Sequence, residues 1–137
     1  MKQYRHGDVF IKPATIPSNV KPVKGTTLAL GEATGHHHTL EPLNLTKKYM
    51  VSEGSPEGPV QKYVSGKELL EMQKMDFQGG RTAPSLVQTE DGRMFFHCHN
   101  TTVLTHQEHG AIVIAPGSYE SIIQREYSPQ EIRRVVD

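Results

Sequence analysis

The sequence predicts a mainly β protein: a small barrel or sandwich of about seven or eight strands with two short helices. Short runs rich in β-branched and aromatic residues alternate with Gly- and Pro-containing turns along most of the chain. Only two segments carry helix start signals. The 137 residues show no internal repeat, so we expect a single domain over residues 1–137. Many short strands usually close into a barrel or stack as a sandwich, because both arrangements limit unpaired strand edges.

Three runs in the first half of the chain have the composition of strands, at residues 9–12, 26–30 and 47–51. Pro13 and Gly31 end the first two, since neither residue continues a regular strand well. Residues 14–25 and 52–59 are rich in proline, glycine and polar side chains, so we expect them to form loops.

Two helices are predicted, near residues 66–75 and 129–135. Ser65 and Glu68 have the spacing of a capping box, in which each side chain bonds a backbone N–H at the start of a helix. Ser128 and Glu131 repeat this spacing, with Pro129 at the first helical position, where no N–H is missed.

The remaining strands are predicted between and around these helices, at residues 86–89, 94–97, 101–105, 111–114 and 119–127. The turn-forming residues Glu90-Asp91-Gly92-Arg93 separate the first two, which is typical of a β-hairpin. Residues 111–114 are uniformly apolar, which favours a buried strand.

Composition argues against several classes of partner. The 15 basic and 15 acidic residues balance, so we expect neither nucleic acid nor an anionic membrane as a partner. No apolar run approaches the length of a membrane span, and the N-terminal residues lack the apolar core of a signal peptide. The single cysteine, Cys98, fits a reducing compartment. We therefore expect a soluble, cytoplasmic protein.

Seven of the eight histidines fall in two blocks, at residues 36–38 and 97–109. Imidazole is the commonest protein ligand of transition metals, so two dense blocks far apart in sequence suggest one site that folding closes. His6 stands alone in the sequence, and we expect it to be a surface residue rather than a ligand.

Spacing selects the candidate ligands within these blocks. In a strand, alternate residues share a face, so His36 and His38 would project together with His37 opposite. His106 and Glu108 have the spacing of half a two-histidine, one-carboxylate triad, and His109 converges on His106 if the segment forms a turn. The predicted metal ligands are therefore His36, His38, His106, His109 and Glu108.

His97 and His99 should also share a strand face, and the sequence leaves open whether they join this site. Cys98 would then point to the opposite face, and we expect a buried, inert thiol rather than a ligand or nucleophile.

Two fragments resemble a known family pattern. Residues 31–41 contain a glycine, His-x-His and a glutamate, and resemble the first cupin motif. Residues 110–120 contain a glycine, an apolar strand and a Pro-Gly turn, and look like the second. The resemblance implies a small metal-binding β-barrel in which His36, His38 and Glu41 are ligands. It places Glu120 where the family usually has a histidine.

The leading hypothesis is a domain that binds one divalent transition metal through clustered histidines. Zinc, iron, nickel, copper and manganese all fit a nitrogen-rich site. A metal-dependent enzyme would need an open coordination position, which the sequence neither requires nor excludes. The alternative is a non-catalytic binding or assembly module whose histidines line a groove or a subunit interface. A small-molecule ligand and a homo-oligomer remain open.

Overall fold

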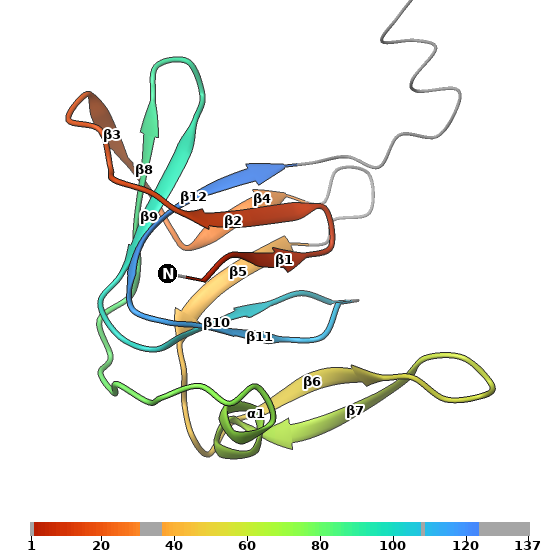
Figure 1. The fold of residues 1–137 in the computed structure, drawn as a ribbon. Coiled ribbons are helices and arrows are strands. Elements are labelled where there is room, and N and C mark those ends of the chain that lie inside the picture. Colours follow the sequence, from red (N-terminus) through yellow and green to blue (C-terminus); the bar gives the residue numbers. More distant parts are fainter. Residues whose placement is uncertain (1, 31–36, 108, 124–137) are drawn as a thin grey trace, which may run out of the picture.

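The computed structural model describes residues 2–30, 37–107 and 109–123, and the statements below concern these residues. They form twelve strands and one helix (Figure 1). The elements are β1 (Tyr4–His6), β2 (Val9–Pro13), β3 (Val20–Val23), β4 (Thr27–Leu30), β5 (His37–Pro42), β6 (Lys48–Glu53), β7 (Val60–Ser65), α1 (Gly66–Met72), β8 (Ser85–Thr89), β9 (Met94–Cys98), β10 (Thr102–Thr105), β11 (Ile112–Ile114) and β12 (Gly117–Ile123).

Two larger sheets pack face to face as a sandwich-like β fold. One has six strands in the order β1-β2-β12-β9-β8-β3, and the other has four in the order β11-β10-β5-β4. Ile11 and Phe96 from the first sheet lie in one buried cluster with Leu40 and Leu104 from the second. The sheets do not close on themselves, so the barrel expected as one of two architectures does not form among the described residues.

The four-stranded sheet is covered on both faces. Along β10, Leu104 points into the core between the sheets, while Val103 packs into a second cluster on the other side. That second cluster includes Val51 of β6 and Leu69 of α1, because the β6–β7 hairpin and the helix lie against this outer face (Figure 1). Coverage on both faces explains why residues 111–114 are uniformly apolar.

The helix prediction is confirmed at residue 65, where the Ser65 and Glu68 capping box forms. The helix ends at Met72 rather than at residue 75, and Lys74 takes a left-handed φ of 53° that a helix cannot contain. The second predicted helix, near residues 129–135, lies outside the described residues. No helix in the described part of the chain is long and apolar enough to cross a membrane.

Each predicted strand corresponds to an observed one, although residues 124–127 of the last prediction lie outside the described residues. The expected total of seven or eight was too low. The strands that the prediction missed are β1, β3, β5 and β7. Strand β3 includes Pro22 and lies within residues 14–25, which were predicted to form a loop. It pairs with β8 alone, at the edge of its sheet, where proline is tolerated. Strand β7 lacks a clear alternation of apolar and polar residues, because most of its side chains are exposed to solvent.

Candidate metal centre

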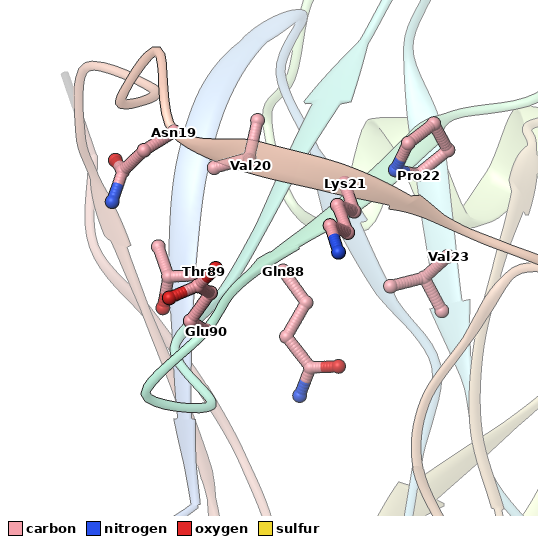
Figure 2. Close-up of a pocket in the computed structure, with 8 residues that line it drawn as sticks. All are labelled: Asn19, Val20, Lys21, Pro22, Val23, Gln88, Thr89 and Glu90. Atoms are coloured by element: carbon pink, nitrogen blue, oxygen red, sulfur yellow. The ribbon is translucent and has the colours of Figure 1, made fainter.

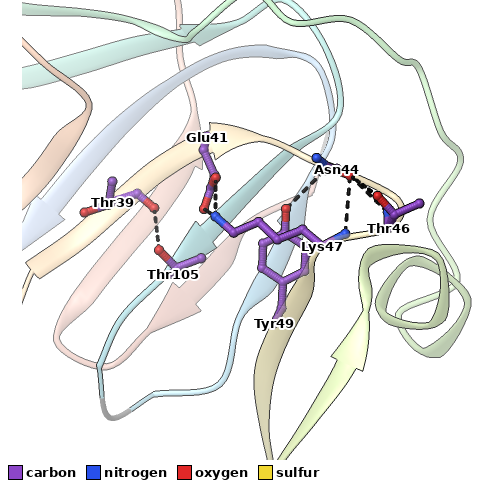
Figure 3. A network of polar contacts seen from close by, with 7 residues as sticks. All are labelled: Thr39, Glu41, Asn44, Thr46, Lys47, Tyr49 and Thr105. Atoms are coloured by element: carbon purple, nitrogen blue, oxygen red, sulfur yellow. Dashed lines mark hydrogen bonds and ion pairs between the residues drawn. The ribbon is translucent and has the colours of Figure 1, made fainter.

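Three segments meet at one end of the sandwich: the β1–β2 turn, the beginning of β5 and the connection from β10 to β11 (Figure 1). Antiparallel pairing of β5 with β10 places Thr39 opposite Thr105, and the Thr105 hydroxyl donates to the Thr39 carbonyl (Figure 3). This register brings His38, just before Thr39, beside His106, just after Thr105. Pairing in the sheet thereby brings the first histidine block beside the end of the second block.

Four imidazoles cluster at this end: those of His6, His38, His106 and His109. The ring centroids of His38 and His106 lie 4.4 Å apart, and those of His106 and His109 lie 4.5 Å apart. His6 is 5.0 Å from His38 and 5.7 Å from His109, again between centroids. The remaining two distances, His6 to His106 and His38 to His109, are both 6.0 Å.

The structure therefore brings together three of the predicted ligands, His38, His106 and His109. It corrects the prediction for His6, which is only 3% exposed and lies inside the cluster instead of on the surface. Tyr4 and His6 alternate with exposed Arg5 along β1, so both point inward. The Gly-Asp pair that follows is a hairpin signal, which marks this short strand in the sequence. His36 and Glu108 lie outside the described residues.

Gly7 allows the β1–β2 turn to pass directly against the cluster. Its φ is 64°, and Gly7 and Asp8 form the two-residue loop of the β1–β2 hairpin, for which glycine in the first position is typical. A Cβ atom at Gly7 would lie 2.5 Å from Nε2 of His109. The positive φ therefore favours glycine here, and a side chain at this position would displace the His109 ring.

Hydrogen bonds at the outer nitrogens orient two of the rings. His6 Nε2 lies 2.9 Å from the Gly110 carbonyl oxygen, which can only accept, so Nε2 carries the hydrogen. His38 Nε2 lies 3.2 Å from Oδ1 of Asp8, and an ionised carboxylate likewise only accepts. In neutral rings the lone pairs are then on the two Nδ1 atoms, which face each other at 2.9 Å. Lone pairs at this distance repel unless a proton or a metal ion lies between them.

Burial favours the neutral form of both rings. Burial and the neighbouring His38 are the main causes that lower the pKa of His6 to about 3. Burial also lowers the pKa of His38, although the Asp8 carboxylate opposes that shift. Neutral imidazole is the form that binds metals.

The other two histidines come from the turn between β10 and β11. His109 donates its backbone N–H to Nδ1 of His106 at 3.3 Å, which closes the turn predicted from their spacing. Across the described ranges, no three His, Cys, Asp or Glu side chains already have the geometry to hold a metal ion. His36 and Glu108 lie outside those ranges.

The glutamates that the family resemblance implied lie elsewhere. Glu41 projects from the opposite face of β5 to His38 and pairs with Lys47 at 2.9 Å (Figure 3). Glu120 is buried in β12, where Nε of Arg93 donates to it at 3.0 Å and Nη2 at 3.1 Å. His37, also opposite to His38, has a buried Nδ1 without a hydrogen-bond partner.

His97 and His99 form a separate pair and show no contact with the four-histidine cluster among the described residues. Their ring centroids are 4.7 Å apart on the outer face of the six-stranded sheet, as the alternation predicted. Cys98 points into the core, so the prediction of a buried thiol is confirmed, and burial raises the pKa of this thiol to about 11.

A shallow groove of about 460 Å³ lies along β3 and β8, lined by side chains that include Lys21, Gln88 and Glu90 (Figure 2). None of the residues that line it is a histidine. The groove is therefore separate from both histidine groups.

A family model described as a domain of unknown function, DUF8820, matches residues 5–65 and 78–124. The chain belongs to this family. The matched segments of this DUF8820 domain contain all four clustered histidines together with Gly7 and Asp8, and the unmatched residues 66–77 include α1. No curated protein and no solved structure matches the chain.

Proposed function

We propose that this DUF8820 domain binds one divalent transition metal ion through His6, His38, His106 and His109. The observation that carries the proposal is the pair of Nδ1 atoms of His6 and His38, whose lone pairs face each other at 2.9 Å. A shared proton would place a charge on two buried rings, which their lowered pKa values disfavour. A metal ion instead uses both lone pairs as ligands.

The hydrogen bonds at the other ring nitrogens support the same conclusion. Metal-ligating histidines almost always donate their second N–H to a carboxylate or a backbone carbonyl, which fixes the ring and raises its basicity. His38 has such a partner in Asp8, and His6 has one in Gly110. Two nitrogens of a tetrahedral zinc site lie about 3.3 Å apart, so a few tenths of an ångström of widening would admit the ion.

The spacing of the four rings is also suitable. With zinc–nitrogen bonds of about 2.0–2.1 Å, the centroids of four tetrahedral imidazoles lie about 5 Å apart. The six observed distances run from 4.4 to 6.0 Å. Binding then requires rotation of the His106 and His109 rings, which lie in a turn where His106 is half buried and His109 is exposed.

The number of bound imidazoles decides between two kinds of site. Four nitrogens would give a closed, structural centre, whereas three would leave a position for water or a small-molecule substrate. Metal binding is the proposed function, and catalysis is an extension that the coordination number would test.

The experiment compares neighbouring histidines on opposite faces of β5. Protein purified without a metal column is titrated calorimetrically with Zn²⁺, alongside the His38→Ala and His37→Ala variants. We expect His38→Ala to weaken binding at least tenfold and His37→Ala to bind as the wild type does, because His37 points away from the cluster. Equal affinity in wild type and His38→Ala would overturn the proposal.

A second variant separates loss of a ligand from loss of folding. His106 is half buried in a turn, so His106→Ala should preserve the circular dichroism spectrum while weakening zinc binding. Unchanged zinc affinity in a folded His106→Ala protein would remove that residue from the ligand set.

A further inference from the structure

The second histidine pair, on the outer face of β9, is not used by the proposed function. Along this strand Phe96 and Cys98 point into the core, so His97 points outward, and His99 follows directly after the strand. His99 is exposed and His97 is half buried. Ser118 of β12, opposite His97 in the sheet, marks the position of the pair.

The pair is far from the first cluster. Ser118 lies five residues along β12 from Ile123, which pairs with Val9 beside the β1–β2 turn. Five residues of strand span about 16 Å, and His6 points to the inner face of the same sheet. No single ion can contact both groups.

Each ring of the pair is held at one nitrogen by a serine hydroxyl. Nδ1 of His97 lies 2.8 Å from Oγ of Ser118. Nε2 of His99 lies 3.3 Å from Oγ of Ser85, which belongs to the neighbouring strand β8. When each serine accepts a hydrogen bond, the lone pairs are on Nε2 of His97 and Nδ1 of His99.

The two rings are placed to share an ion. Their centroids are 4.7 Å apart with the planes at 80°, close to the separation of about 5 Å expected for two imidazoles on one tetrahedral ion. The serines act as the outer hydrogen-bond partners that orient metal-binding histidines. A chelate of two nitrogens leaves the other coordination positions to water or to an external ligand.

We propose that His97 and His99 form a second, exposed binding site for a divalent transition metal, which binds through Nε2 of His97 and Nδ1 of His99. Copper(II) should bind it more tightly than zinc, following the general affinity order for nitrogen ligands. The site should be weaker and exchange faster than the first, because only two protein groups hold the ion. This inference stands on its own observations and does not require the first site to exist.

The test is a calorimetric titration with Cu²⁺ of wild type, His99→Ala, Ser85→Ala and His38→Ala proteins. We expect His99→Ala to lose one equivalent of bound copper, and Ser85→Ala to keep the equivalent with at least a severalfold weaker affinity. His38→Ala should retain this equivalent whether or not the first site binds metal, so the two proposals fail separately.

Long-range ¹H–¹⁵N NMR with Zn²⁺ identifies the ligating atoms. We expect zinc to shift Nε2 of His97 and Nδ1 of His99, while the serine-bound nitrogens keep their hydrogens. Copper binding that is unchanged in His99→Ala would overturn the inference, as would zinc shifts at the two serine-bound nitrogens.

Discussion

Gly7→Ala tests how tightly the β1–β2 turn constrains the four-histidine cluster. The new methyl group would lie 2.5 Å from Nε2 and 2.7 Å from Cδ2 of His109, closer than side-chain atoms approach one another. The ring must move away. A non-glycine residue at a φ of 64° in this turn also adds backbone strain of about 1–3 kcal/mol. The substitution therefore combines a general destabilisation with a displacement of one proposed ligand.

Gly92→Ala is the matched control. Gly92 also has a positive φ, of 91°, in a β-hairpin turn, but a Cβ there meets nothing within 4 Å. Both substitutions should lower the free energy of unfolding of the metal-free protein by a similar amount, about 1–3 kcal/mol. Only Gly7→Ala should also weaken metal binding.

The assay is chemical denaturation with and without zinc. Zinc at 100 times its dissociation constant raises the free energy of unfolding by about 2.7 kcal/mol, and a tenfold loss of affinity reduces that increase to about 1.4 kcal/mol. We expect the smaller increase in Gly7→Ala and the full increase in Gly92→Ala. Equal zinc-dependent increases in the two variants would refute the placement of His109 in the metal site.

Three further predictions concern Asp8, His6 and the helix cap at Ser65. Asp8→Asn should weaken zinc binding about tenfold in a calorimetric titration, because loss of the charge beside His38 lowers the basicity of that ligand. Asp91→Asn, which removes a carboxylate from a different turn, should leave the zinc affinity unchanged. In metal-free protein the pKa of His6 is about 3 when folded and 6.5 when unfolded, so its stabilising contribution is complete above pH 6.5 and is lost as pH falls toward 3. The free energy of unfolding should drop by about 2 kcal/mol between pH 7 and pH 5 from this group, and a His6→Asn variant measured by urea denaturation should lack that drop. Ser65→Ala should cost about 0.5–2 kcal/mol by removing the helix cap, without affecting zinc affinity; a loss near zero would mean that the cap contributes nothing.

Local patterns were sufficient to predict much of the fold. The capping box at Ser65, the hairpin around Gly92 and the apolar run at residues 111–114 each carry their own signal, because short-range bonding or full burial determines them. Strand β3 was missed because Pro22 argues against a strand. Proline is tolerated at a sheet edge, and only the long-range pairing of the strands shows that β3 lies at one. The choice between sandwich and barrel depends on which strands pair over long range, which composition does not specify.

The candidate site was predicted in part for the same reason. The dense histidine blocks predicted His38, His106 and His109 as candidate ligands. The ring distances confirm that these three side chains lie close together. His6 was missed because it is isolated in the sequence, and only the inward alternation of a three-residue strand places it in the cluster. The hydrogen bonds that Asp8 and the Gly110 carbonyl accept from His38 and His6 depend on contacts that no local pattern encodes.

X-ray absorption spectroscopy of protein loaded with one equivalent of Zn²⁺ tests the central claim most directly. We expect three or four nitrogen ligands at about 2.0–2.1 Å with the scattering pattern of imidazole, and one fewer in His6→Ala. A spectrum of zinc surrounded only by oxygen ligands, or one that is identical in His6→Ala, would contradict it.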